Sequence, residues 1–323
     1  MANPPRLLEQ VRNRLRARHL SYRTEKTYLH WIRRYIRFHR LKHPRDMGGP
    51  EVEAFLTSLA VDNKVSASTQ NQALAAVLFL YRHVLEIDLP WLNNLVRAKR
   101  PQRLPVILTR AEVQQVLARL SGTGWLVASM LYGAGLRVSE CLQLRVKDVE
   151  LSRLELLIRD AKGQKDRITV LPKSLVPHLR DHLVRVRILF EEDRRKQRPG
   201  VSLPFALRRK YPQAAVSWGW QYVFPSRSFC RDPYSGERVR HHLHPQNLQR
   251  AVRQAVRAAG LNQPASCHTF RHCFATHLIE DGYDIRTVQE LLGHADVKTT
   301  MIYTHVLNRG ARAVRSPLDG GRQ

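Results

Sequence analysis

Residues 268–305 read HTFRHCFATHLIEDGYDIRTVQELLGHADVKTTMIYTH, and this stretch decides how the C-terminal part of the chain folds. His268 and Arg271 are three residues apart, so on a helix their side chains point the same way. A second predicted helix ends just before His294, and Tyr303 follows nine residues later. A histidine and an arginine aimed together from a helix start suit a phosphate, because arginine offers a planar fork of donors and histidine a further hydrogen bond.

Further cationic groups lie upstream of this stretch. Residues 131–142 read LYGAGLRVSECL, so Arg137 follows a Gly-Ala-Gly break and precedes a predicted helix, where backbone amides already favour anions. We expect Glu140 to orient Arg137 or its helix. Lys162 and Lys165 lie in the turn of a predicted hairpin, free to reach over a bound strand.

These side chains define the chemistry that the chain can perform. The inventory is two arginines, one or two lysines, two histidines and a tyrosine. No convincing acidic cluster is present to hold magnesium, so two-metal hydrolysis is disfavoured, and no metal or cofactor is expected. The remaining chemistry is metal-free phosphoryl transfer onto a side-chain nucleophile. Cations would offset the charge on the phosphate oxygens and help a phenol, with a pKa of about 10, to become a phenolate.

The charge of the chain indicates a polyanionic partner. Its 323 residues carry 54 Lys and Arg against 27 Asp and Glu, a net charge of +27 that is spread along the whole length. Nucleic acid is the first candidate and an anionic membrane the second, but the apolar stretches are too short to cross a bilayer. Four cysteines without a CxxC pair are typical of reduced thiols in a cytoplasm, and the basic N-terminus lacks an apolar signal core.

The first hundred residues have the apolar spacing of helices, with Ser21 as the N-cap of one of them. The expected helices are Leu7–Leu20, Tyr22–Leu41, Glu51–Leu59 and Thr69–Leu85. One face of the second carries Arg33 and Arg37 among other basic residues and no compensating acids, so we favour a phosphate-facing surface over a merely solvated one. Residues 97–105, RAKRPQRLP, are typical of a linker that can lie along DNA.

Beyond this linker the pattern becomes mixed. A Lys-Gly-Gln-Lys turn separates two short runs with strand character, which predicts a hairpin. The expected elements are helices at Ala111–Leu120 and Trp125–Tyr132, strands at Leu154–Ile158 and Arg167–Leu171, and helices again from Gln246 onward.

Five pieces of the sequence occur in the order found in the tyrosine recombinases, the phage integrase family, and the chain resembles that family over almost its whole length. The pieces are GLRVSE, AKGQKDR, HTFRH, LLGH and IYTH. The resemblance implies a mainly helical, two-domain, C-shaped clamp: a helical, SAM-like core-binding domain at 1–101, and a catalytic domain with a small antiparallel sheet at 102–316. Residues 317–323 would be a mobile tail. Four protomers would assemble on two DNA sites in a bacterial cytoplasm, associated with the nucleoid.

The resemblance also implies a role for each matched residue. Tyr303 would attack the DNA and form a 3′-phosphotyrosyl link. Lys162 would protonate the leaving 5′ hydroxyl, with Lys165 as the alternative. The phosphate-holding residues would be Arg137, Arg271, His268 and His294, the two histidines also assisting proton transfer.

A second resemblance narrows this reading to the integron integrases. Roughly thirty residues are inserted between Arg185 and Val223, at about 190–222, and RHHLHP follows from Arg240. Integron integrases insert and excise gene cassettes, and they recognise folded single-stranded sites as well as duplex sites. Aromatic and imidazole faces can stack on the protruding bases of such sites. The residues expected to do so are Trp218, Trp220, His241 and His242, with Pro233 beside them.

Simpler readings remain open beside these. The two tryptophans alternate at strand spacing and are equally compatible with a core. A zinc site formed by residues among 267–277 is disfavoured, because the cysteines lack CxxC partners and Arg271 would repel the ion. His272, His277 and His305 are expected to have only structural roles. The alternative functions are a recombinase limited to duplex sites, a nicking and relaxing enzyme, and a DNA-binding regulator with an inactive pocket.

Overall fold

The computed structural model describes residues 6–87, 105–161, 165–203 and 205–303. They fall into two compact units, Met1–Arg103 and Leu104–Gln323, each of which is described by itself. The fold is mainly helical with small antiparallel sheets, as predicted from the sequence. None of the described helices combines the length and hydropathy that crossing a membrane requires. The predicted linker and C-terminal tail lie largely or wholly outside the described residues.

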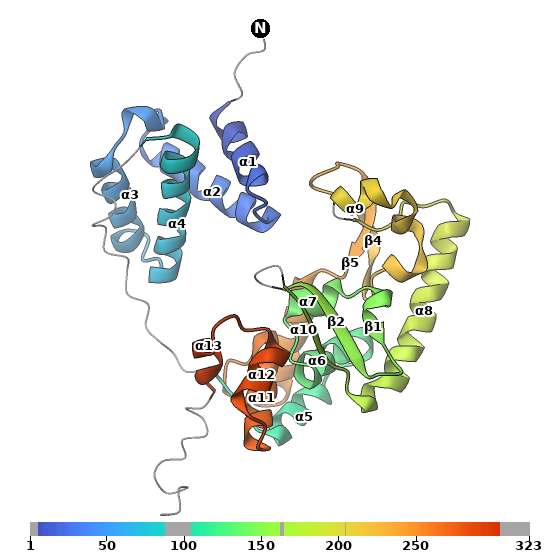
Figure 1. Ribbon diagram of the computed structural model, residues 1–323. Coiled ribbons are helices and arrows are strands. Elements are labelled where there is room, and N and C mark those ends of the chain that lie inside the picture. The colour runs from blue at the N-terminus through green and yellow to red at the C-terminus, as the bar shows by residue number, and fades with distance from the viewer. Residues whose placement is uncertain (1–5, 88–104, 162–164, 204, 304–323) are drawn as a thin grey trace, which may run out of the picture. The chain divides into compact units, whose positions relative to one another are not determined.

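The first unit is a bundle of helices around one apolar core (Figure 1). Its helices are α1 (Leu7–Ala17), α2 (Tyr22–Phe38), α3 (Gly49–Val61) and α4 (Ala67–Leu80), followed by a π-helical turn at Tyr81–Leu85. Ser21 caps α2 as predicted, because its hydroxyl accepts the backbone N–H of Thr24. In the core, the hydroxyls of Tyr35 and Tyr81 lie 2.8 Å apart.

Two sequence-based expectations for this unit need correction. The second helix ends at Phe38 rather than Leu41, because Arg40 and Leu41 adopt left-handed φ values of 52° and 65°. The basic residues expected on this face also include Lys42, which lies beyond the end of the helix, and its Nζ is 3.2 Å from Glu51 Oε1, so the expectation that no acid compensates them was wrong.

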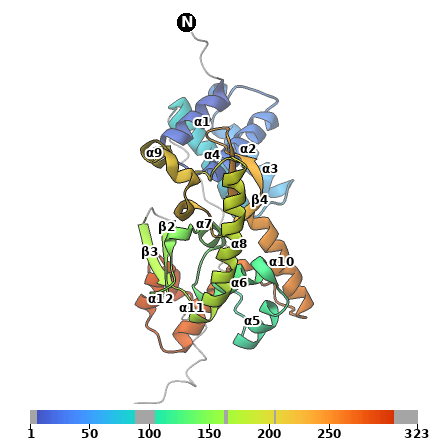
Figure 2. The same ribbon diagram turned by 90° about the vertical axis from the view of Figure 1, so that its right-hand side faces the viewer.

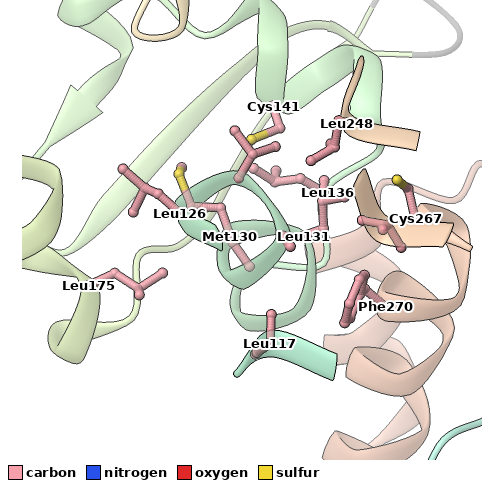
Figure 3. Close-up of a cluster of buried hydrophobic side chains, with 14 of the residues drawn as sticks. Leu117, Leu126, Met130, Leu131, Leu136, Cys141, Leu175, Leu248, Cys267 and Phe270 are labelled. Atoms are coloured by element: carbon pink, nitrogen blue, oxygen red, sulfur yellow. The ribbon is translucent and has the colours of Figure 1, made fainter. Parts of the chain in front are cut away.

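The second unit is built around α6 (Gly122–Gly133), a helix with apolar residues on all sides. Figure 3 shows Leu126, Met130 and Leu131 of α6 pointing into the buried cluster between the surrounding elements. A helix that is apolar all round is stable only when other elements cover every face. The helices of this unit are α5 (Arg110–Leu117), α6, α7 (Val138–Gln143), α8 (Val176–Arg195), α9 (Phe205–Lys210), α10 (Pro245–Ala258), α11 (Cys267–Glu280), α12 (Ile285–Leu292) and α13 (Lys298–Met301).

The unit also contains two antiparallel sheets. One is the meander of β1 (Val149–Glu150), β2 (Glu155–Ala161) and β3 (Lys165–Val170), which confirms the predicted hairpin with longer strands. The other is the hairpin of β4 (Pro225–Arg231) and β5 (Arg238–His242), which the sequence pattern did not predict.

The β4–β5 hairpin is attached to the C-terminal end of α8 by a buried ion pair. Arg240 of β5 donates two hydrogen bonds to the Asp193 carboxylate, one of them 2.7 Å long. In Figure 1 α8 runs along one side of the unit, and Figure 2 shows this side from the front, with α9 near the C-terminal end of α8 in both views. The inserted segment therefore forms an extension of the second unit, and it is held in place by contacts with α8 and β5.

Candidate functional site

The site is organised around one buried carboxylate, that of Glu140 in α7. Glu140 Oε1 and Oε2 accept hydrogen bonds of 2.6 and 2.8 Å from the guanidinium and backbone N–H of Arg137, which precedes the helix. Arg167 of β3 donates two more, at 2.8 and 3.1 Å, and Arg271 Nη1 of α11 lies 3.6 Å away. Burial raises the pKa of the Glu140 carboxyl, but these hydrogen bonds and charges outweigh burial and lower it to about 2. Glu140 thus orients Arg137, as predicted, and gathers two further arginines.

Arg271 is held rigidly by backbone carbonyls on two sides. Its side chain is 1% exposed, and it donates to the carbonyls of Gly135, at 2.5 Å, and Leu292, at 2.6 Å. Gly135 has a φ of +63°, and a Cβ there would lie 2.4 Å from the Phe274 ring, so only glycine allows this approach. Burial and the charge of Arg137 lower the pKa of Arg271 to about 9, which leaves it cationic at neutral pH.

His294 is placed by the end of α12. Gly293 terminates this helix in the left-handed conformation, at φ +65°, as the sequence indicated. His294 Nε2 lies 3.2 Å from Arg271 Nη2, and Nδ1 lies 2.9 Å from Thr300 Oγ1. Since an arginine can only donate, Nε2 is the acceptor and Nδ1 carries the proton. Burial and the neighbouring arginines lower the pKa of His294 to about 3, so its ring is neutral.

Tyr303 completes the site from the segment after α13. Its side chain is buried in a small apolar cluster with Phe274, Val288 and others, and its ring is nearly parallel to that of His294 at a centroid distance of 6.4 Å. The Tyr303 hydroxyl lies 2.9 Å from Nδ1 of His272. Burial raises the pKa of Tyr303, while the charges of Arg271 and Arg137 act in the opposite direction.

The structure therefore brings five of the six predicted catalytic residues into one network. Its members are Arg137, Arg271, His294, Tyr303 and His268, the last through its ring contact with His272 at 4.4 Å. His268 is exposed at the surface of α11. Lys162 lies outside the described residues, as does the side chain of Lys165, whose backbone begins β3. This arrangement of cations around a phenol is suited to metal-free attack on a phosphodiester.

Sequence reasoning missed two residues of this network. Arg167 was assigned only to a strand, although it ends the AKGQKDR segment and its Nε also donates to the Leu291 carbonyl at 2.9 Å. His272 was expected to be merely structural. Its spacing of four residues from His268 on a helix was the signal that could have placed both on one face.

The base-stacking candidates lie on and beside the inserted segment, in two separate groups. The first group consists of Trp220, Arg145, Lys147 and Tyr222. The Trp220 ring centroid lies 3.0 Å from Lys147 Nζ and 5.9 Å from the guanidinium carbon of Arg145. The same guanidinium carbon lies 4.0 Å from the ring centroid of Tyr222. Tyr222 in turn contacts both predicted histidines, at ring distances of 5.5 and 5.4 Å; these are His241 and His242. Burial lowers the pKa of both histidines, so they are uncharged at neutral pH.

Trp218 belongs to the second group, against α8. Its ring lies 5.6 Å from that of Phe190 and 5.0 Å from the Arg187 guanidinium carbon. Trp218 and Trp220 lie in a 3-10 helix, Trp218–Trp220, so the expectation of strand spacing was wrong. Neither is buried in the core, and Pro233 is exposed.

The remaining candidate residues concern DNA binding by the first unit and a candidate metal site. In the first unit, Arg33 and Arg37 are exposed on α2. Among the described residues, no three His, Cys, Asp or Glu side chains are grouped to hold a metal ion. Two members of the disfavoured zinc set are engaged elsewhere: Cys273 Sγ accepts the Leu108 N–H at 3.2 Å, and His277 Nδ1 bonds with the Tyr132 hydroxyl at 2.9 Å.

Comparison with known proteins places these features in a family context. Residues 107–309 match the model of the phage integrase family, and residues 7–91 match that of the phage integrase N-terminal SAM-like domain. An integrase/recombinase of Escherichia coli is 53% identical over 314 residues, covering 97% of this chain and 93% of the relative. The tyrosine recombinase XerA of Thermococcus kodakarensis is 30% identical, covering 95% and 93%.

Solved structures show the same fold. A lambda integrase dimer bound to a COC′ core site superposes with a TM-score of 0.64 at 17% identity, covering 96% of this chain and 79% of that one. XerH recombinase bound to difH substrate gives a TM-score of 0.58 at 23% identity, covering 92% and 80%.

Proposed function

Because the chain belongs to the phage integrase family of tyrosine recombinases, we propose that it is a site-specific DNA recombinase of the integron integrase type. It breaks and rejoins DNA through a 3′-phosphotyrosyl intermediate, and so inserts and excises gene cassettes without metal or cofactor. The observation that carries the proposal is the position of Tyr303: its hydroxyl bonds with His272, and its ring lies parallel to that of His294, which bonds with Arg271.

The proposed reaction follows from the charge, the hydrogen-bond donors and the nucleophile that these side chains supply. Arg137, whose side chain is 25% exposed, and the buried Arg271 hold the scissile phosphate and offset its negative charge. His268 hydrogen-bonds the phosphate, His294 does so once its Nδ1–H turns from Thr300 to a phosphate oxygen, and Tyr303 attacks the phosphorus. As the bond from phosphorus to O5′ breaks, Lys162 protonates the leaving oxygen. One diester replaces another, so a DNA hydroxyl can reverse the attack without ATP.

Preorganisation distinguishes this site from a loose cluster of charges. The Arg271 guanidinium is fixed by two carbonyls, and the Arg137 guanidinium by the Glu140 carboxylate. Neither arginine needs to be reoriented when charge develops on the phosphate oxygens. The site therefore supports catalysis more strongly than an inactive, vestigial pocket.

The integron type rests on the inserted segment. The partly exposed Trp220 lies in one cluster with the uncharged rings of His241 and His242, linked through Arg145 and Tyr222. The flat faces of these rings, beside a cation, are suited to stack on the protruding bases of a folded single strand. Each stacked base contributes about 1–3 kcal/mol to the binding free energy. The net charge of +27 suits the phosphate backbone of both duplex and folded sites. Arg33 and Arg37 would contribute phosphate contacts from the first unit.

The partners follow from the same proposal. The chain acts as a tetramer on paired sites, one of them a duplex attachment site and the other a folded single-stranded cassette site. Two solved structures with this fold are described as bound to DNA sites, namely the lambda integrase dimer and XerH.

The proposal is tested with labelled, nicked oligonucleotides in two forms, a plain duplex and a folded hairpin with protruding bases. We expect covalent adduct on both and tetramers when both sites are present, detected by a denaturing gel and by native mass measurement. Adduct on duplex alone would identify a recombinase limited to duplex sites. Cleavage without tetramers would identify a nicking enzyme, and DNA binding without adduct a regulator.

A further inference from the structure

We propose that His272 accepts the phenolic proton of Tyr303 when this tyrosine attacks the phosphate. The inference rests on the proposed function, and it assigns the proton transfer to the second histidine of the HTFRH segment, for which the sequence predicted only a structural role. It is carried by the contact between His272 Nδ1 and the Tyr303 hydroxyl, at 2.9 Å.

The surroundings of the hydroxyl require an acceptor. Tyr303 is 2% exposed, and a buried hydroxyl proton without an acceptor destabilises the folded state. Arg271 and Arg137, the charged groups that act on Tyr303, are donors only. Within the part of the chain that the structure describes, His272 is the one hydrogen-bond partner of this hydroxyl. His272 Nδ1 is therefore the acceptor, and Nε2 carries the proton of the neutral ring.

The other two histidines of the site are less suited to take the proton. Both ring nitrogens of His294 are engaged, Nε2 with Arg271 and Nδ1 with Thr300, so no lone pair faces the phenol. The ring of His268 makes an edge contact with His272, at 4.4 Å between centroids, but among the described ring contacts it makes none with Tyr303.

Burial and the charges around His272 keep its ring unprotonated, which leaves the Nδ1 lone pair free but makes the ring a weaker base. From its own helix it faces His268 and Arg271, and from the C-terminal segment it faces the phenol of Tyr303. Burial, followed by the charges of His268 and Arg271, lowers the pKa of His272 to about 4. A histidine with a lowered pKa is neutral above that value, so the Nδ1 lone pair is available throughout the neutral pH range.

The proposed step balances in both directions. The bond between Tyr303 Oη and phosphorus forms, the bond from phosphorus to O5′ breaks, and the phenolic proton moves to His272 Nδ1. The leaving oxygen takes its own proton from Lys162 in the proposed function. In the reverse reaction the oxygen of an attacking DNA hydroxyl bonds to phosphorus and gives its proton back to Lys162, while the phosphotyrosyl bond breaks and His272 returns its proton to Tyr303. The exposed ring of His268, beside His272, offers a route to solvent for the proton between the two steps.

Two isosteric variants of the full chain test the step. His272→Asn places an amide oxygen near the position of Nδ1, so it keeps an acceptor but cannot hold a proton, whereas His272→Gln places its amide near Nε2. We expect single-turnover cleavage of a nicked duplex to fall about 100-fold in His272→Asn and further in His272→Gln, with DNA binding unchanged. The cleavage rate of His272→Asn should rise about tenfold per pH unit between about pH 7 and 9, because hydroxide must take the proton, while the wild-type rate stays nearly flat.

The control variant is His178→Asn, on the exposed surface of α8, which should behave as the wild type. A flat pH profile in His272→Asn, at any rate of cleavage, would overturn the inference. A wild-type chain that forms no adduct would instead count against the proposed function.

A second measurement is independent of DNA and of variant folding. Nitrogen-15 NMR of the histidine rings in the intact protein reports which ring nitrogen of His272 carries the proton. We expect an unprotonated Nδ1 that accepts a hydrogen bond. A proton on Nδ1 would show that His272 donates to the phenol, and the inference would then be wrong.

Discussion

Replacing Glu140 by glutamine should destabilise the second unit and slow cleavage together. Glutamine imitates the protonated carboxyl, and lowering the carboxyl pKa from 4.5 to about 2 corresponds to about 3 kcal/mol of stabilisation of the folded state. The Glu140 side chain is only 7% exposed, so solvent does little to screen these ion pairs. We therefore expect Glu140→Gln to lose about 3 kcal/mol of unfolding free energy at pH 7.

The sign of the pH dependence follows from the lowered pKa. The stabilisation is fully present above the unfolded-state pKa of about 4.5, and it is lost as the pH falls through that value toward about 2. The difference between the wild type and Glu140→Gln should thus be largest at neutral pH and shrink below about pH 4.5. Urea denaturation of the full chain measures it, with hydrogen exchange assigning the transition to the second unit.

Cleavage should fall about 100-fold in the same variant, because Arg137 and Arg271 lose the carboxylate that aims them, while DNA binding persists. The matched control is Glu150→Gln, an exposed carboxylate in β1 that should change neither quantity. Wild-type stability at pH 7 together with wild-type cleavage in Glu140→Gln would refute the role assigned to this carboxylate.

Four further predictions concern the proposed nucleophile Tyr303, the inserted segment, Arg167 of β3 and the net charge of the chain. Tyr303→Phe should leave DNA affinity within about twofold, since one hydroxyl is lost, and fluorescence anisotropy showing a large loss of binding would argue against its role. Trp220→Ala should weaken the affinity for a folded DNA hairpin by about tenfold or more and leave the affinity for a duplex unchanged. The control variant Tyr211→Ala, at an exposed position, should change neither affinity. An equal loss of affinity for both DNAs would show that Trp220 only contributes to packing. Arg167→Lys should slow cleavage about tenfold, because lysine cannot reproduce two parallel bonds to Glu140, and an unchanged single-turnover rate would contradict this. Raising the salt concentration should weaken binding of either DNA steeply, and an affinity independent of salt would exclude phosphate contacts as its main source.

The helices and the local part of the site were predictable because their signals are local. The spacing of His268 and Arg271 predicted their common helix, and Gly293 marked the end of the helix before His294. Both signals depend on helical periodicity and on the left-handed conformation that glycine permits. The burial of Tyr303 then follows from its packing against the apolar residues of α12, Val288 and Leu292.

What the sequence did not show depends on contacts between distant residues or on ambiguous spacing. Arg167 meets Glu140 across 27 residues, and no local pattern reveals such a partner. A spacing of two residues, as between Trp218 and Trp220, fits a strand and also a 3-10 helix with three residues per turn. The β4 sequence PSRSFCR lacks the apolar alternation that marks a strand, and the ion pair that attaches this hairpin to α8, Arg240–Asp193, joins residues 47 positions apart.

The most direct test of the account is to find which atom of the protein becomes bonded to DNA. The full chain is trapped on a nicked site, digested with trypsin and analysed by mass spectrometry. We expect the 3′-phosphate on the peptide TTMIYTHVLNR, residues 299–309, at Tyr303 and on no other side chain. A phosphodiester link to any other residue, or strand cleavage that leaves no protein attached, would contradict the central claim that Tyr303 is the nucleophile.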